Sequence, residues 1–331
     1  MKGKILVLWA SLFMGCSTST PVPQPVTSLS PGWEKVATVL SEGKAHCTIA
    51  FDSAHARFVM GFIDEETKQI KWAIAPLADP HKWSPVPGAT FTKGEGWYEI
   101  GGRGICLVRS GNQWYFYFDD LKSGEIGVAI GETLATLEKR ENPVLVGEGG
   151  KGSMEQYVRH PAVVVPEKSH DGQWHMIYDG RKGSPGSAYG DLRHASSKDG
   201  VLWEKDKAHN PILRPSNKDD FEADDVGSPS IITIDDEYWL AYHGYNKRYG
   251  DSVPHFPHWI GVAHSKNCLD WERVSTNPVL PLGELAEFDS KASFGPAWHL
   301  FKDEYIYLYF TGLNAAGERR LAYARYKVTG E

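Results

Sequence analysis

Cysteine is scarce in this chain, with four residues among 331. One of them, Cys16, lies close to the amino terminus, which leaves Cys47, Cys106 and Cys268 for the body of the protein. Three is an odd number, and a chain of this length does not depend on disulfides for its core. We therefore expect buried thiols, with a Cys47–Cys106 bridge as the alternative.

An excess of basic charge is also missing, because 35 Lys and Arg stand against 42 Asp and Glu, for a formal net charge of -7. A surface for nucleic acid or for anionic lipid needs a net basic face, so neither is expected as a partner. The sequence likewise lacks a Gly-rich phosphate cradle followed by a helix, and it lacks the serine pattern of a nucleophile elbow. These absences leave a globular protein with another kind of site.

The apolar run Ile5–Met14 is too short to span a bilayer. It follows a lysine-containing start and precedes Gly15 and Cys16, which is the order of an export signal. The stretch 12–16 resembles a bacterial lipoprotein cleavage box, although the two residues before its glycine are bulkier than usual. We expect 1–16 to be a lipoprotein-type signal peptide, with a lipid on Cys16 in the periplasm or outer membrane and no other membrane contact. Ordinary secretion is the alternative.

Aromatic residues are abundant, with 12 Trp and 15 Tyr, and they recur in a pattern that repeats five times. Each repeat holds an aromatic, alternating run and then a run with small residues, both bounded by turn residues, as β-strands are. The aromatic runs are 58–62, 114–118, 174–178, 238–242 and 305–309, and the runs with small residues are 71–74, 127–130, 193–196, 261–264 and 321–324.

Three repeats close with an Asn-Pro phrase at 142–145, 210–213 and 277–280. One small twisted sheet cannot bury both faces without neighbours, so five such units predict an all-β chain, a five-bladed β-propeller of four-stranded antiparallel blades. We place this single domain at 44–331 and treat 17–43 as a linker and N-terminal segment. The blades are expected at 44–93, 96–147, 155–214, 221–282 and 288–328.

In a propeller the innermost strands converge on the axis, so their entries share one funnel with the returning ends of the second strands. The loop 245–259 is expected to form its rim. The polar groups that this geometry nominates at the entries and returns are His46, Arg103, Arg159, His160, Asp179, Arg181, Asp225, His243 and Ser293.

Several short motifs carry a resemblance to a known family. They are Arg-His-Pro at 159–161, Gly-Ser-Pro-Ser-Ile at 227–231, Phe-Gly-Pro at 294–296 and Ser-Lys-Asp-Gly-Val-Leu-Trp at 197–203. With the five blades, they resemble the glycoside hydrolase superfamily that contains families 32, 43, 117 and 130. The resemblance implies a carboxylate early in the first blade, an Asp before Pro and a Glu before Gly-Pro. This sequence has His46, His160 and Gly227 at those places.

Glycoside hydrolysis needs a proton donor and a base or nucleophile, normally two carboxylates. Asp225 lies two residues before Gly227, so strand alternation puts it on the face where the acid is expected. We take Asp225, His160 and Asp179 as the catalytic candidates, since imidazole titrates near neutrality. The alternatives are a turn carboxylate at 225, with Asp224 and Glu222 as competitors, and a His160 that only bonds a neighbouring blade.

Arginine forms paired hydrogen bonds with anionic groups, so Arg103, Arg159 and Arg181 predict an anionic sugar. Alternatively, each pairs with a local Asp to build the wall of the funnel. His46, His243 and Ser293 complete the predicted substrate-binding set. No metal is expected at His255 and His258, which lie on a Pro-flanked loop. No cofactor is required, and a structural calcium ion on the axis is left open.

We therefore expect an exported, exo-acting glycoside hydrolase that acts on a plant or algal oligosaccharide, with inversion by analogy with the family. A polysaccharide lyase acting on a uronate-containing glycan is the second reading, because arginine would neutralise the carboxylate while histidine or tyrosine removes the adjacent proton. A phosphorylase is less favoured because the protein is expected to be exported. The non-enzymatic reading is a surface lipoprotein that binds glycans without cleaving them.

Overall fold

The computed structural model describes residues 32–91, 101–149, 153, 155–184, 189–217, 220–249, 257–283, 287–300 and 305–327. In this part of the chain, twenty strands form five four-stranded antiparallel sheets, which confirms the five-bladed propeller. The expected signal peptide and Cys16 lie outside these residues, as does the middle of the expected rim loop 245–259. The helical pieces that are described are short single turns, and none could reach across a bilayer.

The four strands of each blade follow one another outward from the axis, except in the last blade. The first blade holds β2 (Lys44–Asp52), β3 (Arg57–Asp64), β4 (Ile70–Pro76) and β5 (Ser84–Phe91), with the 3-10 turn η1 (Ser53–His55). The second holds β6 (Gly101–Ser110), β7 (Gln113–Asp120), β8 (Ile126–Gly131) and β9 (Glu138–Lys139), with η2 (Leu134–Thr136). The third holds β10 (Tyr157–Val164), β11 (Trp174–Arg181), β12 (Gly190–Ser197) and β13 (Trp203–Lys205), with η3 (Pro166–Lys168). The fourth holds β14 (Asp225–Ile234), β15 (Glu237–Tyr245), β16 (His258–Ser265) and β17 (Glu272–Arg273), with η4 (Lys247–Tyr249). The fifth holds β18 (Ala292–Leu300), β19 (Tyr305–Leu313), β20 (Arg319–Lys327) and β1 (Glu34–Glu42).

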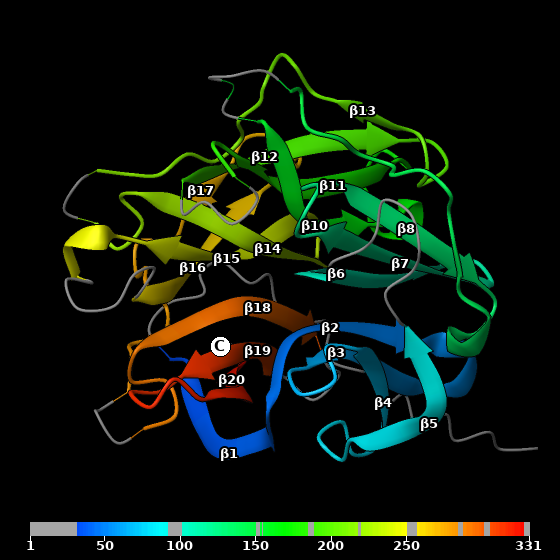
Figure 1. Ribbon diagram of the computed structural model, residues 1–331, viewed down its shortest axis with the longest axis horizontal. Coiled ribbons are helices and arrows are strands. Elements are labelled where there is room, and N and C mark those ends of the chain that lie inside the picture. The colour runs from blue at the N-terminus through cyan, green and yellow to red at the C-terminus, as the bar shows by residue number, and fades with distance from the viewer. Residues whose placement is uncertain are drawn as a thin grey trace, which may run out of the picture.

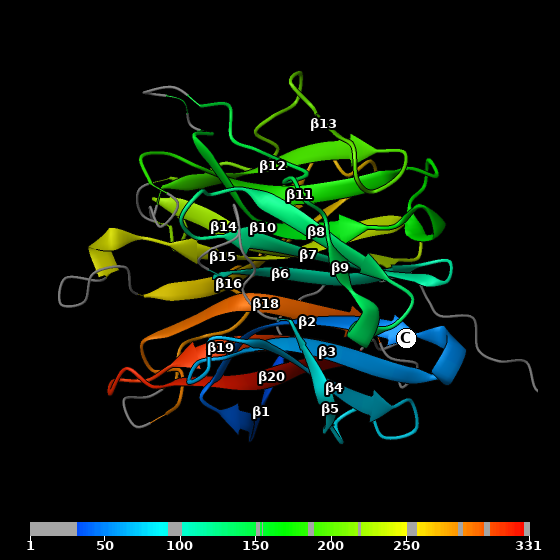
Figure 2. The same ribbon diagram turned by 45° about the vertical axis from the view of Figure 1, so that its right-hand side comes forward.

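The five innermost strands form a closed ring. β2 contacts β6, β6 contacts β10, β10 contacts β14, β14 contacts β18, and β18 contacts β2. Figures 1 and 2 show these strands in the middle of the molecule, with outer strands such as β5, β13 and β1 toward its periphery. Five apolar clusters fill the spaces between neighbouring blades, and each draws its side chains from two blades. Every blade thus buries both of its faces, as the repeat required.

Strand β1 was not anticipated from the sequence, because it lies in the segment that we treated as a linker. It forms the outer edge of the fifth blade by pairing with β20, so Glu34 lies opposite Arg325 and Lys35 opposite Ala324. Lys35 reaches further inward, where its Nζ lies 2.5 Å from a carboxylate oxygen of the fully buried Asp289. The last blade is therefore completed by β1, the first strand of the described residues.

Two smaller predictions can also be compared with the structure. The leucines that end the three Asn-Pro phrases form bridges to third strands, Leu145 to Ile126, Leu213 to Leu192 and Leu280 to Ile260. These phrases therefore end blades, as expected. Cys47, Cys106 and Cys268 are free thiols, so the Cys47–Cys106 bridge is wrong.

Candidate functional site

Bulges in the innermost strands shape the end of the axis at which these strands begin. The pairing register of all five inner strands shifts near its start. At four of these bulges one residue has a left-handed backbone, namely His46, His160, Ser228 and Gly295. These four residues, together with Arg103 and Gly104 from β6, line one small cavity on the axis. The bulges thus bring the expected His46, Arg103 and His160 together.

Side chains on the second strands hold these bulges across the blade boundaries. The backbone N–H of His46 donates to Thr311 Oγ1 at 2.8 Å, and that of His160 donates to Asp119 Oδ2 at 3.2 Å. The N–H of Ser228 donates to Asp179 Oδ1 at 3.0 Å. In each case the acceptor belongs to the preceding blade. Asp179 is therefore a structural acceptor as well as a candidate for catalysis.

A continuous chain of charged groups runs beneath the funnel. His160 Nδ1 lies 2.6 Å from Asp179 Oδ2, and the same oxygen accepts from Arg181 Nη2 at 2.6 Å. Arg181 Nη1 then lies 2.7 Å from both oxygens of Asp225, and His243 Nε2 lies 3.7 Å from the second of them. The site thus contains two histidine–aspartate pairs, one from each of two neighbouring blades, joined by Arg181.

Burial and charge set the ionisation of these groups. Asp179 and Asp225 are 0% and 1% exposed. Burial alone would raise the pKa of each carboxyl, but the adjacent Arg181 holds the pKa of Asp179 below its usual value and that of Asp225 well below it. Burial lowers the pKa of His160 despite the nearby Asp179. The structure thus favours two ionised carboxylates and a neutral His160.

The three arginines expected to bind an anionic sugar have different surroundings. Arg159 and Arg181 are buried, and Arg159 Nε donates to Asp119 at 2.9 Å. The alternative of local ion pairs therefore describes both residues. Arg103 is exposed and lines the axial cavity, so it is the one of the three that faces open space.

The surroundings of Gly227 leave no room for the glutamate that the family resemblance implied at this position. A Cβ atom at Gly227 would lie 2.2 Å from Arg181 Nη2 and 2.9 Å from Asp179 Oδ2. The Arg181 guanidinium thus fills the room that a side chain at 227 would need. A glutamate at 227 and the buried Arg181 guanidinium could not occupy this space together.

Aromatic rings continue around the mouth of the axis from His160. The ring of His243 lies 6.4 Å from that of His160 and 4.8 Å from that of His258, measured between centroids. Phe294 lies 6.0 Å from His258 and 5.3 Å from His46. Phe294 was not assigned a binding role from the sequence, and His258 was expected only as part of the rim loop 245–259. The Phe-Gly-Pro motif marked Phe294, but nothing in its spacing showed that the ring turns toward the mouth.

The remaining candidates lie to the side of this mouth. Ser293 is fully buried and donates to Asp289 at 3.2 Å, so its hydroxyl is engaged inside the protein and is not open to a sugar. Asp224 pairs with the exposed Lys247 at 3.2 Å. Glu222 is fully buried against Arg273. Of the three carboxylates considered around position 225, only Asp225 therefore belongs to the charged chain.

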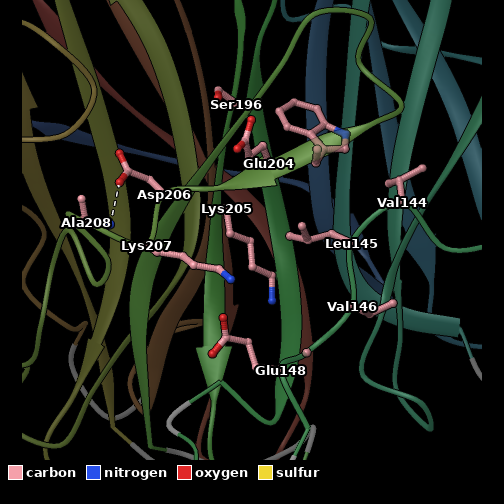
Figure 3. Close-up of a pocket in the computed structure, with 12 residues that line it drawn as sticks. Val144, Leu145, Val146, Glu148, Ser196, Glu204, Lys205, Asp206, Lys207 and Ala208 are labelled. Carbon is pink, nitrogen blue, oxygen red and sulfur yellow. Dashed lines mark hydrogen bonds between the residues drawn. The ribbon is translucent and has the colours of Figure 1, made fainter.

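The cavity at this end of the axis is small, with room of about 20 Å³. One water molecule needs about 10–15 Å³ measured in this way, so the cavity can take a single water beside His160. Larger hollows lie elsewhere. One of about 740 Å³ lies where the inner strands end, and one of about 860 Å³ lies at the outer side of the second and third blades. Figure 3 shows the latter, with Asp206 and Ala208 across from Val144 and Val146.

One group of residues in the funnel could hold a metal. Asp225, His243 and His258 each offer a ligand atom, and these atoms lie within 4.8 Å of one another. Arg181 donates to both oxygens of Asp225, so an ion there would lie beside a guanidinium. The absence of a metal at this loop, expected from the sequence, stays a prediction.

Comparisons with known proteins place this geometry in context. No protein-family model matches the chain. Over 107 residues it is 34% identical to the 1,2-β-oligomannan phosphorylase of Thermoanaerobacter sp. (strain X514), a match that covers 31% of this chain and 33% of that protein. Over 137 residues it is 31% identical to the uncharacterized protein Rv1502 of Mycobacterium tuberculosis (strain ATCC 25618 / H37Rv), covering 41% and 44%. The matches thus span less than half of these relatives.

Solved structures match along nearly the whole chain. A glycoside hydrolase superposes with a TM-score of 0.65 at 14% identity, covering 92% of this protein and 93% of that one. A thermostable family-43 glycoside hydrolase gives 0.64 at 14% identity, covering 88% and 92%. The β-1,2-mannobiose phosphorylase from Listeria innocua, in complex with β-1,2-mannobiose, gives 0.61 at 11% identity, covering 92% and 94%. The fold is thus one that glycoside hydrolases and a glycoside phosphorylase share.

Proposed function

We propose that the protein cleaves glycosidic bonds by hydrolysis, using two histidine–aspartate pairs in place of two carboxylic acids. The observation that carries this proposal is the chain from His160 through Asp179, Arg181 and Asp225 to His243. Hydrolysis needs one group to take a proton from water and another to give a proton to the leaving oxygen. Two imidazoles whose ring centroids are 6.4 Å apart supply both.

His160 fits the role of the base. The ionised Asp179 accepts from Nδ1, which fixes the ring proton there and leaves the lone pair on Nε2, with Arg159 Nη2 3.4 Å away. His160 also lines the axial cavity that has room for one water molecule. In our proposal this water is the nucleophile, and His160 takes its proton as it attacks the anomeric carbon.

His243 then serves as the proton donor to the leaving oxygen. Its Nε2 lies 3.7 Å from the Asp225 carboxylate, which leaves Nδ1 to donate to the leaving oxygen. Inverting glycosidases separate their two catalytic groups by about 6.5–9.5 Å to leave room for water. The separation of the two imidazoles is close to that range, which supports direct attack by water and inversion at the anomeric carbon.

The substrate in this proposal is an anionic or strongly polar oligosaccharide. Arg103 is exposed beside the cavity, and His46 lines the same cavity with Phe294 packed against its ring. An exposed guanidinium at the mouth can bind a carboxylate or sulfate of the sugar in paired geometry. Because the axis is narrow here, we propose that the enzyme removes units from a chain end, outside the cytoplasm and held by the lipid on Cys16.

Phosphorolysis is the second candidate, because part of the chain is 34% identical to an oligomannan phosphorylase. Phosphate itself would be the nucleophile, so a single proton donor would suffice, and Arg103 could bind the anion. The axial cavity has room for one water molecule beside His160, which favours hydrolysis. The two reactions differ in a simple way, because only one consumes phosphate.

The test uses the mature protein with neutral, uronate-containing and sulfated oligosaccharides, each with and without inorganic phosphate. We expect release of a reducing sugar that does not depend on phosphate and is lost in His160→Asn. Formation of a sugar phosphate only when phosphate is present would replace hydrolysis with phosphorolysis. Rising ultraviolet absorbance from an unsaturated product would identify a lyase, and binding without any product would identify a glycan-capture protein.

A further inference from the structure

A second cluster of ligand-type side chains lies far from the funnel. It consists of His175 on β11, His194 on β12 and Cys268 in the turn that follows β16. Their exposed fractions are 6%, 4% and 0%, and their ligand atoms lie within 4.8 Å of one another. His175 precedes Arg181 by six residues on the same strand, so about 20 Å of β11 separates the cluster from the charged chain. The proposed glycosidase chemistry makes no use of it.

The two imidazoles already face each other. His175 lies opposite Ser196 in the β11–β12 ladder, and His194 is two residues from Ser196, so both side chains project from the same face. His175 Nδ1 lies 2.9 Å from His194 Nε2, as a hydrogen bond requires. Two nitrogens bound to one tetrahedral Zn²⁺ are about 3.3 Å apart, given Zn–N bonds of about 2.0–2.1 Å. For these two nitrogens, an ion could therefore replace the shared proton after a movement of a few tenths of an ångström.

A carboxylate lies behind each ring. His175 Nε2 donates to Asp171 Oδ1 at 2.9 Å. His194 Nδ1 is buried without a hydrogen-bond partner and lies 3.8 Å from Asp206 Oδ2. Histidines that bind metals usually donate their other N–H to a carboxylate, which fixes the ring and makes it a better ligand. The cluster thus has outer carboxylates on the sides away from the ligand atoms.

Cys268 stands where the matching turn of the third blade has a glycine. The two turns run Ser-Lys-Asp-Gly at 197–200 and Ser-Lys-Asn-Cys at 265–268. Trp203 Nε1 donates to the Gly200 carbonyl at 3.2 Å, and Trp271 Nε1 donates to the Cys268 carbonyl at 3.1 Å. Both positions are left-handed, with φ of 74° and 64°. Glycine suits such a backbone better than cysteine does, yet this position carries a fully buried thiol in the apolar cluster between the third and fourth blades.

We propose that His175, His194 and Cys268 bind one divalent ion of the Zn²⁺ class. Two imidazoles and one thiolate are the ligands that this class of ion prefers over Ca²⁺ or Mg²⁺. Because the histidines belong to the third blade and the cysteine to the fourth, the ion joins the two blades. It serves as a structural crosslink that is separate from catalysis.

The test uses Co²⁺ as the probe, since a thiolate bound to Co²⁺ gives an intense charge-transfer absorption in the near ultraviolet. The chelator-treated mature protein is titrated with Co²⁺, and bound metal is counted after dialysis. We expect one ion per chain, the thiolate band and a higher melting temperature with metal. Cys268→Gly restores the residue of the matching turn, so it should fold without metal and lose both the band and the metal-dependent rise in melting temperature.

Two variants serve as matched controls. Cys106→Ser removes a different free thiol, and His258→Asn removes a histidine of the funnel cluster. Both should keep the band and the stoichiometry, whereas His194→Asn should lose them. No stoichiometric binding, or a band that survives Cys268→Gly, would overturn the proposal. So would loss of Co²⁺ in His258→Asn alone, because the ion would then belong to the funnel.

Discussion

Arg181 uses a single nitrogen, Nη1, to reach both carboxylate oxygens of Asp225, each at 2.7 Å, while its other terminal nitrogen donates to Asp179. One guanidinium therefore bridges two buried carboxylates from neighbouring blades. The orientation of both candidate histidines depends on this guanidinium, because each ring lies next to one of the two carboxylates.

Removing the charge at Asp225 should affect both stability and activity. Asp225→Asn leaves Arg181 with one ionised partner, and breaking a buried ion pair costs about 3 kcal/mol. We expect a lower urea midpoint and loss of sugar release. Asp224→Asn is the matched control, because Asp224 is the adjacent carboxylate and pairs with an exposed lysine. Equal effects of the two variants would show that Asp225 has no special place in the site.

Gly227→Ala should displace Arg181. The added methyl would lie 2.2 Å from Nη2, so the guanidinium must leave its bonds to Asp179 and Asp225. We expect a loss of activity of at least tenfold together with a lower urea midpoint. Gly111→Ala is the comparison, since its methyl would meet nothing within 4 Å and only the left-handed backbone is strained. Activity unchanged in Gly227→Ala would mean that catalysis does not need the Arg181 link.

The proposed base should set the acidic side of the pH–activity profile. Burial lowers the pKa of His160, so it should be neutral at pH 7 and lose activity only as the pH falls below its usual value of about 6.5. His160→Asn keeps a residue that tolerates the left-handed backbone, and kcat should fall by about 10²–10⁴-fold. His209→Asn, which alters an exposed histidine, should change neither quantity. The proposal fails if the acidic limb persists unchanged in His160→Asn.

Stability should also decrease in mild acid. Burial lowers the pKa of His46 and of His160 in the folded state, so the unfolded chain binds more protons once the pH falls below about 6.5. The free energy of unfolding should therefore be lower at pH 5.5 than at pH 7.5. Urea unfolding at the two pH values measures this difference, and it should shrink in His46→Asn. A midpoint that does not change with pH would contradict the assigned burial.

The ion pair between Lys35 and Asp289 should stabilise the closed ring. Lys35→Ala leaves a fully buried carboxylate with Ser293 as a remaining donor, so we expect a cost of about 2 kcal/mol. Lys68→Ala removes a more exposed pair with Glu65 and should cost less than about 1 kcal/mol. Chemical denaturation compares the two. Equal midpoints would show that β1 is held by its backbone pairing alone.

The five blades could be predicted from the sequence because strand alternation and turn residues are local signals that recur in every blade. β1 could not, since its partner β20 lies nearly 300 residues away and its own residues carry no repeat. The sequence alone could not show whether each arginine binds an anionic substrate or forms an ion pair with a nearby carboxylate. That choice depends on which strands are neighbours, and the structure pairs Arg159 and Arg181 with aspartates.

The cluster around Cys268 was also missed, although a signal was present. The turns at 197–203 and 265–271 are repeats of one another, and aligning them shows a cysteine in place of a glycine. Its two histidines come from different strands of another blade, so no spacing along the chain would have united the three residues.

The pairing of β1 with β20 also determines when the last blade can form during synthesis. A ribosome delivers Glu34–Glu42 before the other strands, yet the slot that receives this segment exists only after Arg319–Lys327 has emerged. Until then an early strand must stay unpaired, and the fifth blade keeps an open edge that could accept a strand from another molecule. In a permuted gene that encodes residues 34–42 after residue 327, β1 would be synthesised after its partner β20. The strand could then pair as soon as it emerged from the ribosome, and the ring of blades would close without an unpaired early strand.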